Sequence, residues 1–444
     1  MQSIRCRFRT LRGCVAVMAV GPTLVMIVGS SPAIAADWTR WGGPKQDWTV
    51  DTSGLADEWP AEGPKAIWKR ALGEGYSGVI SDGKRLYTMY REEGKKVEGE
   101  DGKEIDGKEA VVALRADNGE TVWEMKYESP VSKEHVAQFG KGPRSTPLLY
   151  EGKLYTIGVA GKMHCLDPND GKVIWSHDLW SEFEGATILN HGYSSCVFPY
   201  KGTVITMVGG PGHGLVAFDK DSGSTLWEKQ DFGNSYSTPK LITVNGEEQL
   251  LCFMADELIA VDPANGELKW SYKHGNQWKQ NICLPVLGDD NILLFSSPEA
   301  GSKGVRLVKD GDKTKLEEVW STRKIQFYHT TAIRIGDYVY GSSGTMQPCF
   351  YSAINMKTGD VAWRKRDFAK ATSLYADGKF IILDEEGNLG LATATPEDLK
   401  IHSKVPLLEK VAWTVPTLVG KTLFLRDQKN IMALDLGKPT AGAN

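Results

Sequence analysis

The amino-acid sequence predicts an all-β fold: an eight-bladed β-propeller of four-stranded antiparallel blades, with the last blade closed by N- and C-terminal strands. Three observations lead to this prediction. A phrase typical of a β-hairpin recurs along the 444-residue chain, a short Ser/Thr motif recurs eight times, and helical periodicity is almost absent. Units that repeat every 40–50 residues or so indicate sheets that stack on one another.

The recurring phrase alternates apolar and polar residues, passes through an Asp- or Asn-containing turn with glycine, and ends on a tryptophan. Alternation is typical of a half-buried strand, and these turn residues favour a tight connection to a second strand. Clear copies end at Trp123, Trp175, Trp227, Trp270 and Trp363, and a degenerate copy ends at Trp320. Each phrase predicts a β-hairpin, and we expect its tryptophan to pack against the neighbouring unit.

Two incomplete copies predict how the ring closes. Trp68 has no hairpin before it, and Ile431–Leu436 resembles the first half of a phrase that lacks its tryptophan. We expect these segments to pair in one blade, because this pairing removes the open sheet edges that invite aggregation. The seventh copy, residues 389–407, also lacks a tryptophan and gives a weak hairpin.

The Ser/Thr motif precedes the first strand of each unit. In a propeller this strand lines the central channel, so we expect the residues at the start of the motifs to meet at one mouth. Aromatic side chains there offer contact area with a polar tip, and arginine pairs with carboxylates. The candidate ligand-binding residues are Tyr76, Arg144, His191, Tyr193, Tyr236, His329, Lys370 and Trp413. The alternative is that these side chains only plug the channel.

The ends of the chain and one insertion lie outside this repeat. Residues 1–35 combine four arginines, an apolar run and small residues before a cleavage point, which predicts a signal peptide and export to the periplasm or the medium. Residues 36–64 are expected to pack on the propeller as an extension, residues 65–437 to form the propeller, and residues 438–444 to be a disordered tail. The charged segment 91–109 predicts a solvated extension of the first blade, or else an arm that docks a partner.

Charge and cysteine content exclude several classes of function. Without the four leader arginines, 48 basic residues face 56 acidic ones, a net charge of −8, which argues against nucleic acid as a partner. No membrane span is expected after the leader. The remaining five cysteines are not adjacent and are expected to be small buried side chains. No catalytic triad and no metal-ligand spacing are found, so neither a catalytic residue nor a metal site is predicted.

Repeats of the form Ala-x-Asp-x-x-Thr/Asn-Gly-x-x-x-Trp resemble the PQQ-like, or quinoprotein-type, eight-bladed propellers, and the resemblance covers roughly residues 37–437. The opening Asp37–Pro44 also resembles that of secreted members of this family. The resemblance implies two different functions. BamB-like members are scaffolds without a cofactor, whereas the quinoprotein alcohol dehydrogenases hold PQQ and calcium.

The departures from the dehydrogenase pattern favour the first function. Adjacent cysteines under the quinone and a Cys-x-x-Cys-His haem site are both absent from the sequence. We therefore expect an exported binding or scaffold protein without a cofactor, acting on an envelope polypeptide or a small ligand at the mouth. The alternative is a PQQ- and calcium-dependent dehydrogenase of an alcohol or sugar, with Arg144, Lys370 and the aromatic residues around the quinone.

Overall fold

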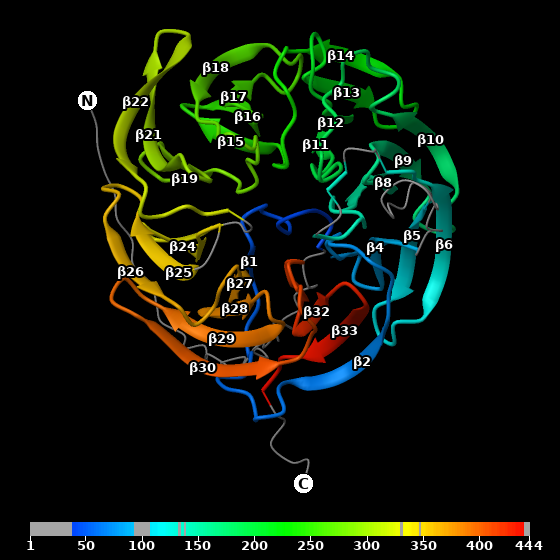
Figure 1. Ribbon diagram of the computed structural model, residues 1–444, viewed down its shortest axis with the longest axis vertical. Coiled ribbons are helices and arrows are strands. Elements are labelled where there is room, and N and C mark those ends of the chain that lie inside the picture. Colours follow the sequence, from blue (N-terminus) through cyan, green and yellow to red (C-terminus); the bar gives the residue numbers. More distant parts are fainter. Residues whose placement is uncertain are drawn as a thin grey trace, which may run out of the picture. The chain divides into compact units, whose positions relative to one another are not determined.

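The computed structural model describes residues 38–92, 107–131, 135–136, 139–328, 332–345 and 348–438. These residues form eight sheets arranged in a ring, an eight-bladed β-propeller (Figure 1). The described part of the chain contains no helix long and apolar enough to cross a membrane. The predicted fold class is confirmed.

Each blade is a meander of four antiparallel strands, numbered here from the channel outward. Blade 1 contains β3 (Ile80–Ser81), β4 (Arg85–Arg91), β5 (Lys108–Arg115) and β6 (Thr121–Glu128). Blade 2 contains β7 (Leu148–Tyr150), β8 (Lys153–Ile157), β9 (Lys162–Leu166) and β10 (Val173–Asp178). Blade 3 contains β11 (Phe198–Tyr200), β12 (Thr203–Met207), β13 (Leu215–Asp219) and β14 (Thr225–Lys229). Blade 4 contains β15 (Lys240–Val244), β16 (Glu247–Phe253), β17 (Glu257–Val261) and β18 (Leu268–Lys273).

The second half of the ring follows the same plan. Blade 5 contains β19 (Val286–Leu287), β20 (Ile292–Ser297), β21 (Gly301–Asp310) and β22 (Lys313–Thr322). Blade 6 contains β23 (Ile333–Ile335), β24 (Tyr338–Ser343), β25 (Phe350–Asn355) and β26 (Val361–Lys365). Blade 7 contains β27 (Thr372–Ala376), β28 (Lys379–Leu383), β29 (Asn388–Ala394) and β30 (Leu399–Pro406), with β1 (Thr49–Val50) added in parallel to β27. Blade 8 contains β31 (Thr417–Val419), β32 (Thr422–Arg426), β33 (Asn430–Asp435) and β2 (Lys65–Ala71).

The ring closes through blade 8, as the two incomplete repeats predict. Trp68 of β2 pairs with Ala433 of β33 in an antiparallel register. On the other side of this blade, the buried Arg426 side chain donates to the carbonyl oxygens of Met89 (2.7 Å) and Gly73 (3.1 Å) in the first blade and the segment that leads into it. Main-chain pairing and a buried guanidinium therefore join the two ends of the propeller.

A β-bulge directs the tryptophans toward the next blade. In every outer strand the pairing register shifts by one residue directly before the tryptophan position. The extra residue turns the following side chain off the regular alternation. The bulge residues are Ile67, Val122, Ile174, Leu226, Lys269, Val319, Ala362 and His402.

Most of these tryptophans form a repeated contact with the following blade. The Trp175 ring packs against the turn residue Gly223 of blade 3, where an added Cβ would lie 2.7 Å from the ring. Its Nε1 donates to the Lys220 carbonyl oxygen at 3.2 Å. The same indole-to-carbonyl bond joins Trp68 to Ala116, Trp123 to Pro168, Trp320 to Met356 and Trp363 to Thr395. The expectation that these tryptophans pack against the neighbouring unit is confirmed.

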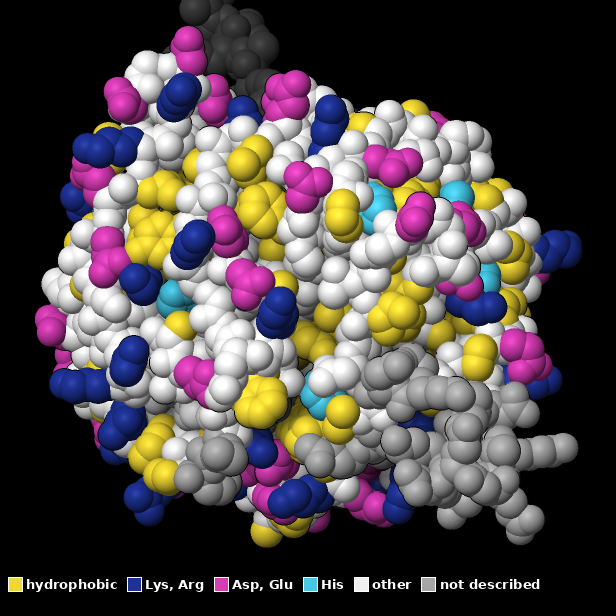
Figure 2. All heavy atoms as spheres, turned by 45° about the horizontal axis from the view of Figure 1, so that its top comes forward, with side chains coloured by type: hydrophobic (Ala, Val, Ile, Leu, Met, Phe, Trp, Pro, Cys, Tyr) yellow, Lys and Arg dark blue, Asp and Glu magenta, His cyan; other side chains and the backbone are white. Residues whose placement is uncertain are grey.

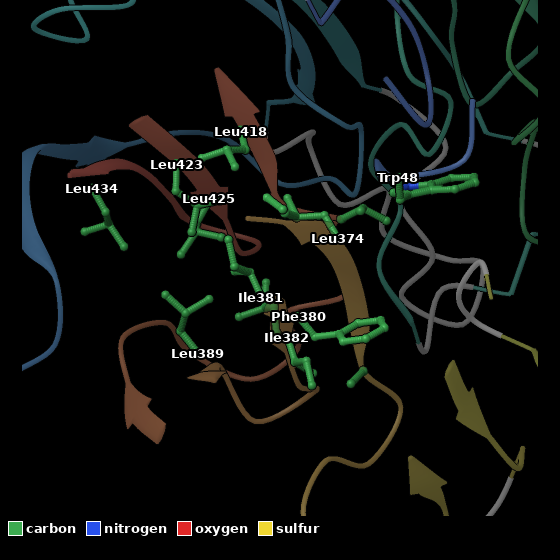
Figure 3. Close-up of a cluster of buried hydrophobic side chains, with 14 of the residues drawn as sticks. Trp48, Leu374, Phe380, Ile381, Ile382, Leu389, Leu418, Leu423, Leu425 and Leu434 are labelled. Atoms are coloured by element: carbon green, nitrogen blue, oxygen red, sulfur yellow. The ribbon is translucent and has the colours of Figure 1, made fainter. Parts of the chain in front are cut away.

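The largest hydrophobic core cluster includes the facing surfaces of blades 7 and 8. Figure 3 shows Leu374, Ile381 and Leu389 of blade 7 near Leu425 and Leu434 of blade 8, with Trp48 of the N-terminal segment at the edge. All of these side chains are buried, as are the Cys165, Cys196, Cys252 and Cys283 thiols.

Several sequence-based boundaries fall partly or wholly outside the described residues. The predicted signal peptide does so entirely, and residues 93–106 of the charged insertion do so as well. Of the predicted tail, only Lys438 is described, and its Nζ lies 2.8 Å from the Asp57 carboxylate.

Candidate functional site

The N-terminal segment crosses the channel at the end toward which the inner strands run. The Ser81 and Leu149 amides of blades 1 and 2 donate to the carbonyl oxygens of Trp38 and Thr39, both at 2.8 Å. The Tyr375 amide of blade 7 donates to the Trp48 carbonyl at 2.9 Å. In Figure 1 this segment, in blue, runs over the centre of the ring. Its buried Trp38 and Trp48 side chains occupy one end of the channel.

The candidate site lies at the opposite end, where the inner strands begin. All connections from an outer strand to the next inner strand reach this face, because every blade runs in the same direction. Five aromatic or imidazole rings, one from each of five such connections, form a continuous series there. Tyr76 stacks on Trp413 with centroids 5.4 Å apart, Phe139 lies 5.6 Å from Trp413 and 5.9 Å from His191, and His191 lies 5.9 Å from Tyr236.

Arg144 holds this series together. Its guanidinium carbon lies 4.9 Å from the Tyr76 ring centroid, a cation–π contact. Its Nε donates to the His191 carbonyl oxygen at 2.7 Å, and its Nη2 donates to the Gly140 carbonyl oxygen at 3.0 Å. Burial lowers the pKa of Arg144. Among the described residues no carboxylate forms an ion pair with this guanidinium; three carbonyl oxygens accept from it, and the Glu74 carboxylate acts on its charge at longer range.

A second cation at the mouth is paired. The Lys370 Nζ lies 3.2 Å from the Glu385 carboxylate, and the Trp413 Nε1 donates to the same carboxylate oxygen at 3.0 Å. Lys370 also lies 5.8 Å from the centroid of the Trp413 ring. The Glu385 side chain is buried, so its charge is compensated within the site.

The Tyr76, Tyr236 and His191 side chains of the mouth are neutral near pH 7. The Tyr236 hydroxyl donates to the Asn190 Oδ1 at 2.7 Å and accepts the His191 amide at 3.3 Å. Burial raises the pKa of both Tyr76 and Tyr236 to about 12. Burial, and then the nearby Arg144 charge, lower the pKa of His191.

The structure brings six of the eight predicted residues to this mouth: Tyr76, Arg144, His191, Tyr236, Lys370 and Trp413. His329 lies outside the described residues. Sequence reasoning missed Phe139 and Glu385. Phe139 belongs to a long connection without a repeat signal, and Glu385 follows the second strand of blade 7 rather than preceding a first strand.

The placement of Tyr193 is corrected. Its side chain is fully buried, and its hydroxyl donates to the Met207 carbonyl oxygen at 2.7 Å, away from the mouth. Cys196 links Thr146 and Thr238, since its Sγ accepts the Thr146 amide at 3.2 Å and its amide donates to the Thr238 Oγ1 at 3.1 Å. Cys196 is therefore equivalent to these threonines, and Ser194 is the equivalent of Arg144 and Tyr236. The triplet that begins at Tyr193 resembles the motif, but the motif itself begins one residue later, at Ser194.

The described residues contain no group of three or more His, Cys, Asp or Glu side chains that could hold a metal ion. The buried Glu385 carboxylate beside the aromatic series is engaged by Lys370 and Trp413. Figure 2 shows acidic, basic and hydrophobic side chains interspersed over the face that it draws.

Comparison with known proteins identifies the family. A family model described as "Outer membrane protein assembly factor BamB" matches residues 107–365, more than half of the chain. The chain belongs to this PQQ-like β-propeller family. The predicted resemblance is confirmed.

Individual relatives of this PQQ-like propeller include an outer membrane protein assembly factor and a quinoprotein alcohol dehydrogenase. The outer membrane protein assembly factor BamB of Alkalilimnicola ehrlichii is 24% identical over 45% of this chain and 47% of its own length. The quinoprotein alcohol dehydrogenase PedH of Pseudomonas putida is 29% identical over 35% of this chain and 33% of its own. The chain thus spans less than half the length of either relative.

Among solved structures, the computationally designed Ika8 protein superposes with a TM-score of 0.52 at 9% identity, covering 84% of this chain and 99% of that one. A likeness at this identity concerns the fold alone.

Proposed function

We propose that this chain is an exported, non-catalytic PQQ-like propeller that binds a polypeptide or a small ligand at the channel mouth. The observation that carries the proposal is the series of rings around Arg144. Aromatic faces bury a large area at a small entropic cost, and an arginine that has no carboxylate partner among the described residues attracts an acidic group. Because Trp38 and Trp48 occupy the other end of the channel, a ligand would approach from this mouth.

The proposed location is the periplasm or the medium, and the proposed partner is a polypeptide of the cell envelope. Two features support this. Residues 1–35 have the basic, apolar and small-residue order of a signal peptide, and the matched family is described as an outer membrane protein assembly factor. The acidic balance of the chain disfavours nucleic acid as a partner.

The second candidate function is a PQQ-dependent alcohol or sugar dehydrogenase. The similarity to PedH favours it. One observation disfavours it: calcium, which accompanies PQQ, prefers carboxylate and other oxygen ligands, and the described residues contain no group of three or more His, Cys, Asp or Glu side chains that could hold a metal ion. The chain also has no adjacent cysteines.

Site-specific photo-crosslinking tests the first function. A photoreactive amino acid replaces Phe139 at the mouth, and in a matched control it replaces the equally exposed Val122 of the outer rim. We expect envelope polypeptides to crosslink at position 139 and not at position 122. Arg144→Ala should remove the crosslink without unfolding the protein, and Arg144→Lys should restore part of it.

Three results would count against this function. Equal crosslinking at both positions would remove the mouth as the binding site. Unfolding of the Arg144→Ala variant would show that Arg144 is part of a structural plug. Saturable binding of PQQ with calcium, followed by dye-linked alcohol oxidation, would establish the dehydrogenase instead.

A further inference from the structure

A compact group of cations that form no ion pair with a described carboxylate lies on the rim of blades 5 and 6, away from the mouth. It consists of Arg323 and Lys324, which directly follow β22, and Arg364 and Arg366 at the end of β26. All four side chains are exposed. Since both strands end at the face that carries the mouth, the four cations lie on that same face.

Two contacts show that these residues form one surface. The Arg364 Nη1 donates to the Lys324 carbonyl oxygen at 3.3 Å, which joins the connection after blade 5 to the outer strand of blade 6. Arg364 and Arg366 both lie over the ring of Phe350, with guanidinium carbons 4.5 and 5.6 Å from its centroid. We call these four cations and Phe350 the blade 5–6 basic cluster.

The described carboxylates do not pair with the charges of this cluster. Ion pairs hold many other cations of the chain, such as Lys303 on Glu318 and Arg334 on Asp289. None of the four cations of the cluster forms such a pair within the described residues. Four uncompensated positive charges therefore lie together on a chain whose net charge is −4.

We propose that the blade 5–6 basic cluster is a docking surface for an acidic polypeptide segment. Arginine binds carboxylates through two parallel hydrogen bonds, and two guanidinium groups fixed on one ring lose little freedom when they do so. In an extended chain, alternate side chains lie roughly 7 Å apart on one side, a spacing that lets neighbouring acidic residues reach neighbouring arginines.

The composition of the cluster favours a polypeptide over a lipid surface. Stable membrane association usually adds exposed apolar side chains to a basic patch. Here the single aromatic ring is covered by two guanidinium groups, and no large hydrophobic residue of the cluster is exposed. The proposal concerns a surface distinct from the mouth and does not depend on what the mouth binds.

Fluorescence anisotropy with a fluorescein-labelled polyglutamate peptide tests this proposal. We expect the wild-type protein to bind the peptide and to release it as NaCl rises from about 0.05 M to about 0.5 M, because salt screens exposed charges. Arg364→Glu with Arg366→Glu should weaken binding at least about tenfold, since like charges then face each other. Arg323→Glu with Lys324→Glu should act in the same direction, since these side chains form no hydrogen bond or ion pair with a described residue.

The matched control reverses two charges elsewhere on blade 5. Lys309 and Lys313 are exposed, lie at the opposite end of the β21–β22 hairpin, and form no ion pair with a described residue. Lys309→Glu with Lys313→Glu changes the net charge equally and should leave peptide binding within about twofold of wild type. Equal losses in the control and cluster variants, no binding of the peptide by wild type, or binding only to vesicles of anionic lipid would each overturn the proposal.

Discussion

Truncation of Trp175 tests the contact that holds neighbouring blades together. The indole ring is buried between blades 2 and 3, where it packs on Gly223 and lies near Tyr155 and Phe218, with centroids 5.8 and 6.2 Å away. Its Nε1 also donates to the Lys220 carbonyl oxygen. Trp175→Ala therefore removes a large apolar surface and one hydrogen bond at the same time.

The magnitude follows from these two losses. Truncation of a buried aromatic side chain to alanine costs about 3–5 kcal/mol, including the cavity that it leaves. The Lys220 carbonyl contributes about 1 kcal/mol of this, as a typical net hydrogen bond. We expect Trp175→Ala to lower the free energy of unfolding by about 3–5 kcal/mol.

Phenylalanine variants separate packing from hydrogen bonding. Trp175→Phe keeps an aromatic ring but loses the donor to Lys220. Trp227 in the next blade is the matched control: its ring also packs on a turn glycine, Gly266, but its buried Nε1 has no acceptor in the structure. Trp227→Phe should therefore cost about 1 kcal/mol less than Trp175→Phe, because no hydrogen bond is lost.

Urea unfolding followed by far-UV circular dichroism measures these differences as shifts of the midpoint. A Trp175→Ala midpoint equal to that of wild type would show that the ring carries no blade-to-blade contact. Equal losses in Trp175→Phe and Trp227→Phe would contradict the role of the indole-to-carbonyl bond.

Two further predictions concern buried ionisable groups. Arg426→Met should lower the free energy of unfolding by about 2–4 kcal/mol, because the carbonyl oxygens of Met89 and Gly73 lose a charged donor. The same urea assay measures this change. An unchanged midpoint would mean that ring closure does not need the guanidinium. Burial lowers the pKa of His164 to about 4, whereas histidine in the unfolded chain has a pKa near 6.5. The unfolded state therefore binds more protons in this range, and the free energy of unfolding decreases as the pH drops from about 6.5 to about 4. His164→Phe should reduce this loss of stability by roughly 2–3 kcal/mol at pH 4. A pH profile identical to that of wild type would exclude His164 as the source of the loss.

The sequence predicts the ring well because each blade repeats the same local requirements. A turn with glycine, two alternating strands and a tryptophan beside the next turn are all encoded within about 15 residues, so they can be found without knowing the fold. Trp68 without a hairpin and Ile431–Leu436 without a tryptophan predict the closing blade for the same reason.

The mouth is harder to predict because its contacts join residues far apart in the sequence. Phe139 reaches Trp413 across the closing blade, and Glu385 meets Trp413 from a different type of connection. Neither residue repeats between blades, so periodicity gives no signal. The error at Tyr193 has a related cause. Serines stand at both of the next two positions, and the register becomes clear only from the bonds of Cys196 with Thr146 and Thr238.

The missing tryptophan of blade 7 and the closure of blade 8 have one explanation. In most other blades, the tryptophan packs beside the turn between the third and fourth strands of the next blade. Blade 8 has no such turn, since its third strand, β33, and its fourth strand, β2, come from opposite ends of the chain. A tryptophan at the blade 7 position would have no turn to receive it, and Ser403 stands there instead.

The N-terminal segment takes the place of that turn. The Ala56 amide donates to the Leu436 carbonyl oxygen at 2.8 Å, directly after β33, and the Trp59 amide donates to the Ser403 Oγ at 2.7 Å. The buried Trp59 thus comes from the segment that replaces the turn rather than from the outer strand. Residues 55–59 contact both the closing blade and blade 7, so the segment that crosses the channel also completes the ring. A change that detaches this segment would therefore destabilise blade 8 and expose the channel end beside Trp48.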